Sequence, residues 1–214
     1  MPAPEPLDRA ARAAAVGARG RCTADEASEL AALATADADP RVRAAALAAL
    51  VRSAPRATAA RVWGVAATDA VATVRRRAAE TAPALGRAVP AGALTRLLHD
   101  ADPWVAEAAA FALGEHPRAG ARAIDALVAA ARTHPDPLVR EAAVAALGAL
   151  GDPRGLPAVL DACTDRPAVR RRAVVALAAF DGPEVEAALT AALTDRDRQV
   201  REAAEILAGR RDAG

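Results

Sequence analysis

The sequence contains very few aromatic residues and no tyrosine. Aromatic side chains make up 2% of the 214 residues, although 53% of the residues are hydrophobic. The apolar content therefore consists mainly of Ala, Leu and Val, and Ala has the highest helix propensity of all residues. This composition excludes a core built on large rings and predicts an all-α protein.

Lysine and asparagine are also absent, so all 28 basic residues are arginines. Residues with A/T-rich codons are rare along the whole chain, and a GC-rich genome explains this bias without a functional cause. The high arginine content is therefore not, by itself, a sign of nucleic-acid binding.

Neither sign of charge dominates. The formal net charge is +1, with 28 basic and 27 acidic residues, whereas a duplex-binding domain usually has a basic excess or a basic face. Arg, Asp or Glu interrupts every apolar run, and residues 1–6 lack the basic and apolar regions of a signal peptide. We therefore expect neither nucleic acid nor a membrane as partner, and a cytoplasmic location.

Patterns that carry chemistry are missing too. The two cysteines, Cys22 and Cys163, lie far apart in sequence and are expected to be reduced thiols. The three histidines, His99, His116 and His134, do not have the i, i+4 spacing of a metal-binding helix, and no Cys-x-x-Cys or His-Glu-x-x-His occurs. No Gly-x-Ser-x-Gly or glycine-rich phosphate loop is present. The sequence predicts no catalytic residues, no metal and no cofactor, and hence no enzyme.

A repeat with a period of about 30 residues is what the sequence does contain. Six times, a valine opens a run of small apolar residues, and in five cases an arginine follows it. The valines are Val42, Val74, Val105, Val139, Val169 and Val200. A period of this size indicates stacked supersecondary units.

The clearest unit runs over residues 119–148. Apolar residues at helical spacing in its first half predict one amphipathic helix, which His134 and the prolines after it end. Asp136 is suited to be the N-cap of a second helix, with Pro137 at its first position. Gly148 is expected to end that helix, and Pro83 is expected to end or kink the corresponding helix of the second repeat.

The second half of this unit, Asp-Pro-Leu-Val-Arg-Glu-Ala-Ala followed by Ala-Leu-Gly, resembles HEAT repeats, and more closely the short variety named for phycobilin lyases. The resemblance implies a right-handed α-solenoid of about six helix pairs, forming a single domain over 1–214. Residues 5–18 are expected to be an N-terminal capping helix. The expected repeats are 24–52, 57–85, 89–115, 119–150, 153–180 and 182–209.

The resemblance also implies a ladder in which an aspartate before each second helix pairs with the arginine after the valine, as a structural feature. The arginines are Arg43, Arg75, Arg140, Arg170 and Arg201, and the matching aspartates are Asp37, Asp69, Asp100 and Asp195. His134 and Thr164 replace the aspartate in two repeats, so the ladder is expected to be broken or rerouted there.

A helical projection sorts each second helix relative to its valine, which we number position 0. Positions 3, 4, 7 and 8 are expected to be buried, whereas positions −1, 2 and 6 share another edge. In HEAT-like arrays the second helices line the concave surface, so this edge is a candidate partner-binding surface. In the third repeat it carries Trp104, Glu107 and Phe111, and a tryptophan is a favoured binding anchor. Packing of this edge between neighbouring helices is the alternative.

Position 2 alternates in sign, because Arg76 and Arg171 occur in some repeats and Glu107 and Glu141 in others. Such a mixed surface suits a protein or a peptide better than a uniformly charged polymer. The predicted function is a non-catalytic interaction scaffold, and the candidate partner-binding residues are Trp104, Glu107, Phe111, Glu141, Arg76 and Arg171.

Two other functions remain open from the resemblance. HEAT-like alkylpurine DNA glycosylases grip the DNA backbone, and phycobilin lyase-type proteins act on tetrapyrroles or form lyase subunits. The C-terminal edge, with Ile206 and Leu207, is also a possible surface for homo-oligomerisation.

Overall fold

The protein is almost entirely helical. The computed structural model describes residues 5–212, and the side chains of residues 5–209, and no strand occurs in this part of the chain. Three short 3₁₀ helices are η1 (Gly86–Ala88), η2 (Pro153–Gly155) and η3 (Leu177–Ala179). The α-helices are α1 (Pro6–Ala18), α2 (Ala24–Ala36), α3 (Pro40–Ser53), α4 (Arg56–Ala66), α5 (Ala72–Leu85), α6 (Ala91–Leu98), α7 (Pro103–Gly114), α8 (Gly120–Thr133), α9 (Pro137–Leu150), α10 (Leu156–Ala162), α11 (Pro167–Ala176), α12 (Pro183–Ala192) and α13 (Arg198–Asp212).

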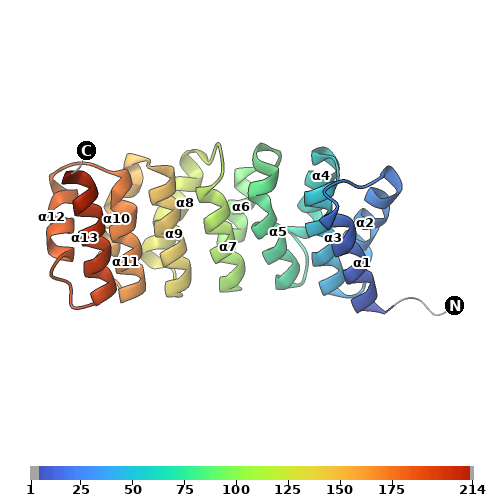
Figure 1. Cartoon of the computed structure of the whole chain (residues 1–214), viewed down its shortest axis with the longest axis horizontal. Helices are drawn as coiled ribbons and strands as arrows, with labels where there is room; N and C mark the ends of the chain where they lie inside the picture. Colours follow the sequence, from blue (N-terminus) through green and yellow to red (C-terminus); the bar gives the residue numbers. More distant parts are fainter. Residues whose placement is uncertain (1–4, 213–214) are drawn as a thin grey trace. The chain divides into compact units, whose positions relative to one another are not determined.

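The chain divides into two compact units. The first is Met1–Ala112 with His116–Arg118, and the second is Leu113–Glu115 with Ala119–Gly214. Within each unit the helices form pairs, and the second helices of successive pairs lie side by side (Figure 1). Thus α1, α3 and α5 form one row in the first unit, and α9, α11 and α13 form one in the second. The single-domain organisation over 1–214 stays a prediction.

The repeating valines lie at the centre of each helix pair. All six are at most 1% exposed. Positions 4 and 8 beside them are buried as expected, except that Ala208, at position 8 of α13, is half-buried. Position 3 departs from the prediction outside α7, because it is exposed at Arg77 and half-buried at Arg172. Position 5 is buried instead in every second helix except α13, as at Leu47 and Val144. The difference arises because a second helix is covered on two sides, by its own first helix and by the next second helix.

Helix ends follow local chemistry in most places. The Asp136 side chain accepts a hydrogen bond from the Leu138 backbone N–H, with Pro137 at the first position of α9. Two predicted helix ends are wrong. Pro83 does not end α5, because it lies inside the last turn and the helix continues to Leu85; the alternative of a kink there stays a prediction. Gly148 does not end α9, because the helix continues to Leu150 and Gly151 adopts the left-handed conformation there.

The predicted N-terminal helix is confirmed as α1, and it packs on α3. Its contacts are those of a second helix. Arg9 forms an ion pair with Asp37, and Gly17 lies so close to α3 that a Cβ atom there would be 2.8 Å from the Ala49 Cα. In the second unit, a Cβ atom on Gly148 would likewise be 2.8 Å from the Ala176 Cα.

Candidate interaction surface

The ladder of arginines and aspartates links successive repeats. The Arg43 guanidinium donates through Nε and Nη2 to the two carboxylate oxygens of Asp69, at 2.8 Å each. Its third nitrogen, Nη1, donates to the Asp37 backbone carbonyl at 2.8 Å. Arg43 therefore binds the turn of its own repeat and the aspartate of the next one, with the bidentate geometry that makes such pairs strong.

The same arrangement recurs along both units. Bidentate pairs join Arg9 to Asp37, Arg75 to Asp100, Arg140 to Asp165, and Arg170 to Asp195. The ladder is therefore not broken in the repeat that carries Thr164, because the neighbouring aspartate takes the ladder position. The predicted structural role of these charges is confirmed.

The ladder lacks both partners at one step. Ala106 stands where the third repeat would supply the arginine, and His134 stands where the fourth would supply the aspartate. His134 keeps half of the aspartate's role, because its Nδ1 accepts a hydrogen bond from the Asp136 backbone N–H at 3.1 Å. It has no carboxylate for a bidentate pair. The chain divides into its two units between these positions.

The ladder pairs shift the ionisation of their carboxylates. Hydrogen bonds from Arg43 hold the pKa of Asp69 below its ordinary value, and Arg75 does the same to the pKa of Asp100. Because the two members of each of these pairs satisfy one another, the paired residues offer no free charge to a ligand.

An exposed aromatic pair distinguishes the first unit. Trp104, on the first turn of α7, is 52% exposed, and Phe111, two turns further along, is 56% exposed. The Arg76 guanidinium of α5 lies over the Trp104 ring, 5.3 Å from its centroid, within the range of a cation–π contact. Two of the candidate residues, Arg76 and Trp104, are thus brought together, and the edge is not packed between neighbouring helices here.

A small network of charged groups lies on the Arg76 side of the Trp104 ring. Arg76 also pairs with Glu80, which binds Arg77 as well. Glu107 lies between the two aromatic residues in sequence and is half-buried. The aromatic surface of the first unit, formed by Trp104, Phe111 and Arg76, therefore combines apolar area with fixed charge of both signs.

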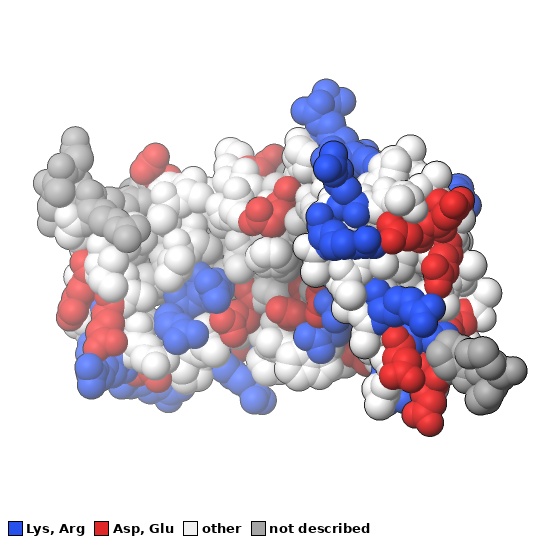
Figure 2. Space-filling model, turned by 45° about the vertical axis from the view of Figure 1, so that its right-hand side comes forward, with Lys and Arg blue, Asp and Glu red and all other residues white. Residues whose placement is uncertain are grey.

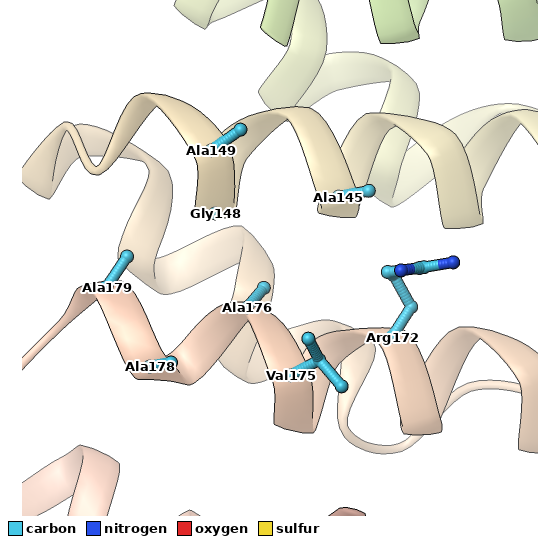
Figure 3. A pocket seen from close by; sticks show the side chains of 8 residues that line it. All are labelled: Ala145, Gly148, Ala149, Arg172, Val175, Ala176, Ala178 and Ala179. Carbon is cyan, nitrogen blue, oxygen red and sulfur yellow. The ribbon is translucent and has the colours of Figure 1, made fainter. Parts of the chain in front are cut away.

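Candidate residues of the second unit form a different surface. Glu141 pairs with Arg172 at 3.3 Å, and Arg171 donates to the Gln199 side chain at 3.0 Å. A shallow pocket of about 150 Å³ opens between α9 and α11, with Arg172 at its rim (Figure 3). Its other lining residues are Ala145, Gly148, Ala149, Val175, Ala176, Ala178 and Ala179. The sequence did not indicate this pocket, because it depends on the close approach at Gly148.

The remaining reactive side chains have structural partners. The buried His116 ring lies between the Val89 carbonyl and the Arg118 backbone N–H, at 2.9 and 3.1 Å. Burial raises the pKa of the Cys163 thiol to about 11, and Cys22 is a free thiol too. No cluster of three or more His, Cys, Asp or Glu suited to a metal ion occurs among the described residues.

Charged side chains of both signs occur on the face seen in Figure 2, where small basic and acidic groups lie beside one another. In the part of the chain that the structure covers, no helix is long and apolar enough to cross a membrane.

Comparison with protein families identifies the repeat. Residues 90–168 match the family model for HEAT repeats, and residues 169–195 match the model for the PBS lyase HEAT-like repeat. No curated protein matches the chain.

Solved structures show the same fold. The X-ray structure of YibA from Escherichia coli has a TM-score of 0.73 and 20% identity, covering 97% of this chain and 78% of that one. A designed armadillo repeat protein in complex with the peptide (KR)4 has a TM-score of 0.62 and 15% identity, covering 85% and 97%. Human deoxyhypusine hydroxylase in complex with glycerol has a TM-score of 0.50 and 23% identity, covering 98% and 81%. The predicted α-solenoid class is thereby confirmed.

Proposed function

The chain is a HEAT-repeat protein of the phycobilin lyase-type repeat family, and we propose that it is a non-catalytic scaffold that binds a protein or peptide on its second helices. The observation that carries the proposal is the exposure of Trp104 and Phe111 on α7. Large exposed apolar residues that lie together on a rigid element are a common feature of binding surfaces.

The spacing of the Trp104 and Phe111 rings suits an apolar side chain of a partner as an anchor. Trp104 and Phe111 are seven residues apart, so their Cα atoms are separated by about 10.5 Å along the helix axis. An apolar side chain of a partner fits between two such rings. Arg76 covers one face of the Trp104 ring, which limits the ring's rotation and lowers the entropy that binding would cost.

The charges around the rings favour a polypeptide partner. Arg76, Arg77 and Glu80 form a mixed pair network, and a peptide carries both signs of charge and backbone groups to match it. In fold this chain is similar to a designed armadillo repeat protein that is in complex with the peptide (KR)4. The two free thiols support the proposal that the scaffold acts in the cytoplasm.

Selection from a random peptide library tests the proposal. We expect the wild-type chain to enrich peptides with at least one apolar anchor. Replacing a central binding residue typically costs about 2 kcal/mol or more, so Trp104→Ala should weaken the selected peptides about 30-fold. Isothermal titration calorimetry measures this change.

Val65→Ala is the matched control, because Val65 is an exposed apolar residue on the first helix α4. The control should bind the selected peptides as the wild type does. Equal affinity of Trp104→Ala and the wild type, or no enrichment of any peptide, would contradict the proposal.

A further inference from the structure

Helix α1 has the register of a second helix, although no first helix precedes it in the described part of the chain. Arg9 binds Asp37 as Arg43 binds Asp69, and Gly17 meets Ala49 as Gly148 meets Ala176. Arg9 therefore corresponds to position 1 and Gly17 to position 9, and both assignments place position 0 of α1 at Asp8. Its position 4 is then Arg12, and its position 7 is Ala15.

In the other second helices, these two positions face the preceding repeat. In α3 and α11, positions 4 and 7 are alanines that are at most 5% exposed: Ala46, Ala49, Ala173 and Ala176. In α1, Arg12 and Ala15 are exposed. The outer face of α1 is therefore of the kind that contacts a preceding repeat, and none of the described residues covers it.

Helix α13 presents the other side of such a contact, namely the face that meets the following repeat in the other second helices. Arg201 is oriented like the other ladder arginines, because its Nη1 donates to the Asp195 backbone carbonyl at 2.7 Å. The other ladder arginines place Nε and Nη2 on an aspartate of the next repeat. No carboxylate of the described residues forms an ion pair with Arg201, so this side of its guanidinium is open.

Two further positions of α13 repeat the pattern. Gly209 is at position 9, as Gly148 is in α9, yet nothing lies within 4 Å of a Cβ atom built on it. Position 5, which is Val144 in α9 and Val174 in α11 and is buried in both, is the exposed Glu205 in α13.

The register sets which positions meet. Because position 9 of one second helix meets position 7 of the next, the positions one turn earlier, 5 and 4, face each other. On the neighbouring side of the same two helices, Ala145 at position 6 of α9 and Arg172 at position 3 of α11 line one pocket (Figure 3). Position 5 of α13 is Glu205 and position 4 of α1 is Arg12, so the two outer faces carry opposite charges where internal repeats carry apolar residues.

We infer that α13 of one molecule packs on α1 of a second copy, head to tail. Glu205 pairs with Arg12 across this contact, and Gly209 lies against Ala15. The open side of the Arg201 guanidinium binds a carboxylate at the start of α1, where Glu5 and Asp8 are exposed. Such a contact joins two different surfaces and produces open chains or a closed ring. The inference is independent of the aromatic surface, because it uses only the two end helices.

Sedimentation velocity over a wide range of protein concentration tests the inference. The wild type should sediment faster as concentration rises, and added salt should weaken the association. Glu205→Arg and Arg12→Glu should each weaken association at least about tenfold, because like charges then face each other. The double variant, with the charges exchanged, should restore it.

Steric and folding controls complete the test. Ala15→Trp should block association, whereas Ala32→Trp, at an exposed alanine of α2, should not. All these positions are exposed, so circular dichroism and melting temperature should be unchanged. A wild type that stays monomeric at every concentration, or self-association that the charge variants leave unchanged, would overturn the inference.

Discussion

At the scale of single residues, each ladder aspartate has two roles. The Asp100 carboxylate accepts two hydrogen bonds from Arg75 and one from the Asp102 backbone N–H. It therefore fixes its own turn and joins it to the preceding repeat. The sequence pattern located most of the ladder residues but missed Asp165 and Arg9. It did not show that a ladder arginine reaches the aspartate of the next repeat, because that pairing depends on how repeats stack.

Removing one ladder carboxylate should destabilise the fold. The Asp100 side chain is only 9% exposed, and Asp100→Ala leaves the Arg75 guanidinium without its charge partner, so we expect a loss of about 2–4 kcal/mol in the free energy of unfolding. Urea denaturation measures it. Asp152→Ala, which removes an ion pair and a cap hydrogen bond within one turn, should cost less, about 1 kcal/mol. Equal losses for both variants would contradict the structural role of the ladder.

The ladder also predicts how acid affects stability. The Arg75 guanidinium holds the pKa of Asp100 below its ordinary 3.8. The folded state thus has the lower pKa, so this contribution is fully present above about pH 3.8 and is lost as the pH falls through the folded value. Asp100→Asn should therefore lose less stability than the wild type between neutral pH and strong acid. Thermal unfolding at several pH values checks this, and parallel losses in the two proteins would count against it.

At the scale of helices, close packing depends on small residues at defined positions. The extents of the helices were largely predictable from proline, aspartate and apolar spacing, because these act locally. The role of Gly148 was not, since a glycine near a helix end has the same sequence signature whether it ends the helix or contacts a neighbour. In the structure, Ala176 of α11 lies so close to Gly148 that only a residue without a Cβ atom fits there.

Two glycine substitutions separate these roles. A Cβ atom on Gly148 would lie 2.7 Å from the Ala176 Cβ, so Gly148→Ala should force α9 and α11 apart and cost about 1–3 kcal/mol. Gly64, inside α4, has nothing within 4 Å, and Gly64→Ala should instead stabilise the protein by up to about 1 kcal/mol. Stability that rises in both variants would show that the contact at Gly148 is not tight.

At the scale of the whole molecule, the repeat predicted the fold class but only part of the interaction surface. The helical projection put Trp104 and Phe111 on an edge that either binds a partner or packs between helices, and only the neighbouring side chains decide between the two. In the structure both rings are exposed. The candidate residues of the second unit, Glu141 and Arg171, have partners within their own surface instead.

The central claim is that the aromatic surface of the first unit binds a polypeptide. The most direct test uses the contrast between the two tryptophans, because Trp63 is 1% exposed and Trp104 is 52% exposed. Quenching of the intrinsic fluorescence by acrylamide therefore reports on Trp104. The account predicts that a saturating library-selected peptide protects this accessible fluorescence from acrylamide. Fluorescence that remains equally quenchable with the peptide bound would show that the partner binds elsewhere and would contradict the account.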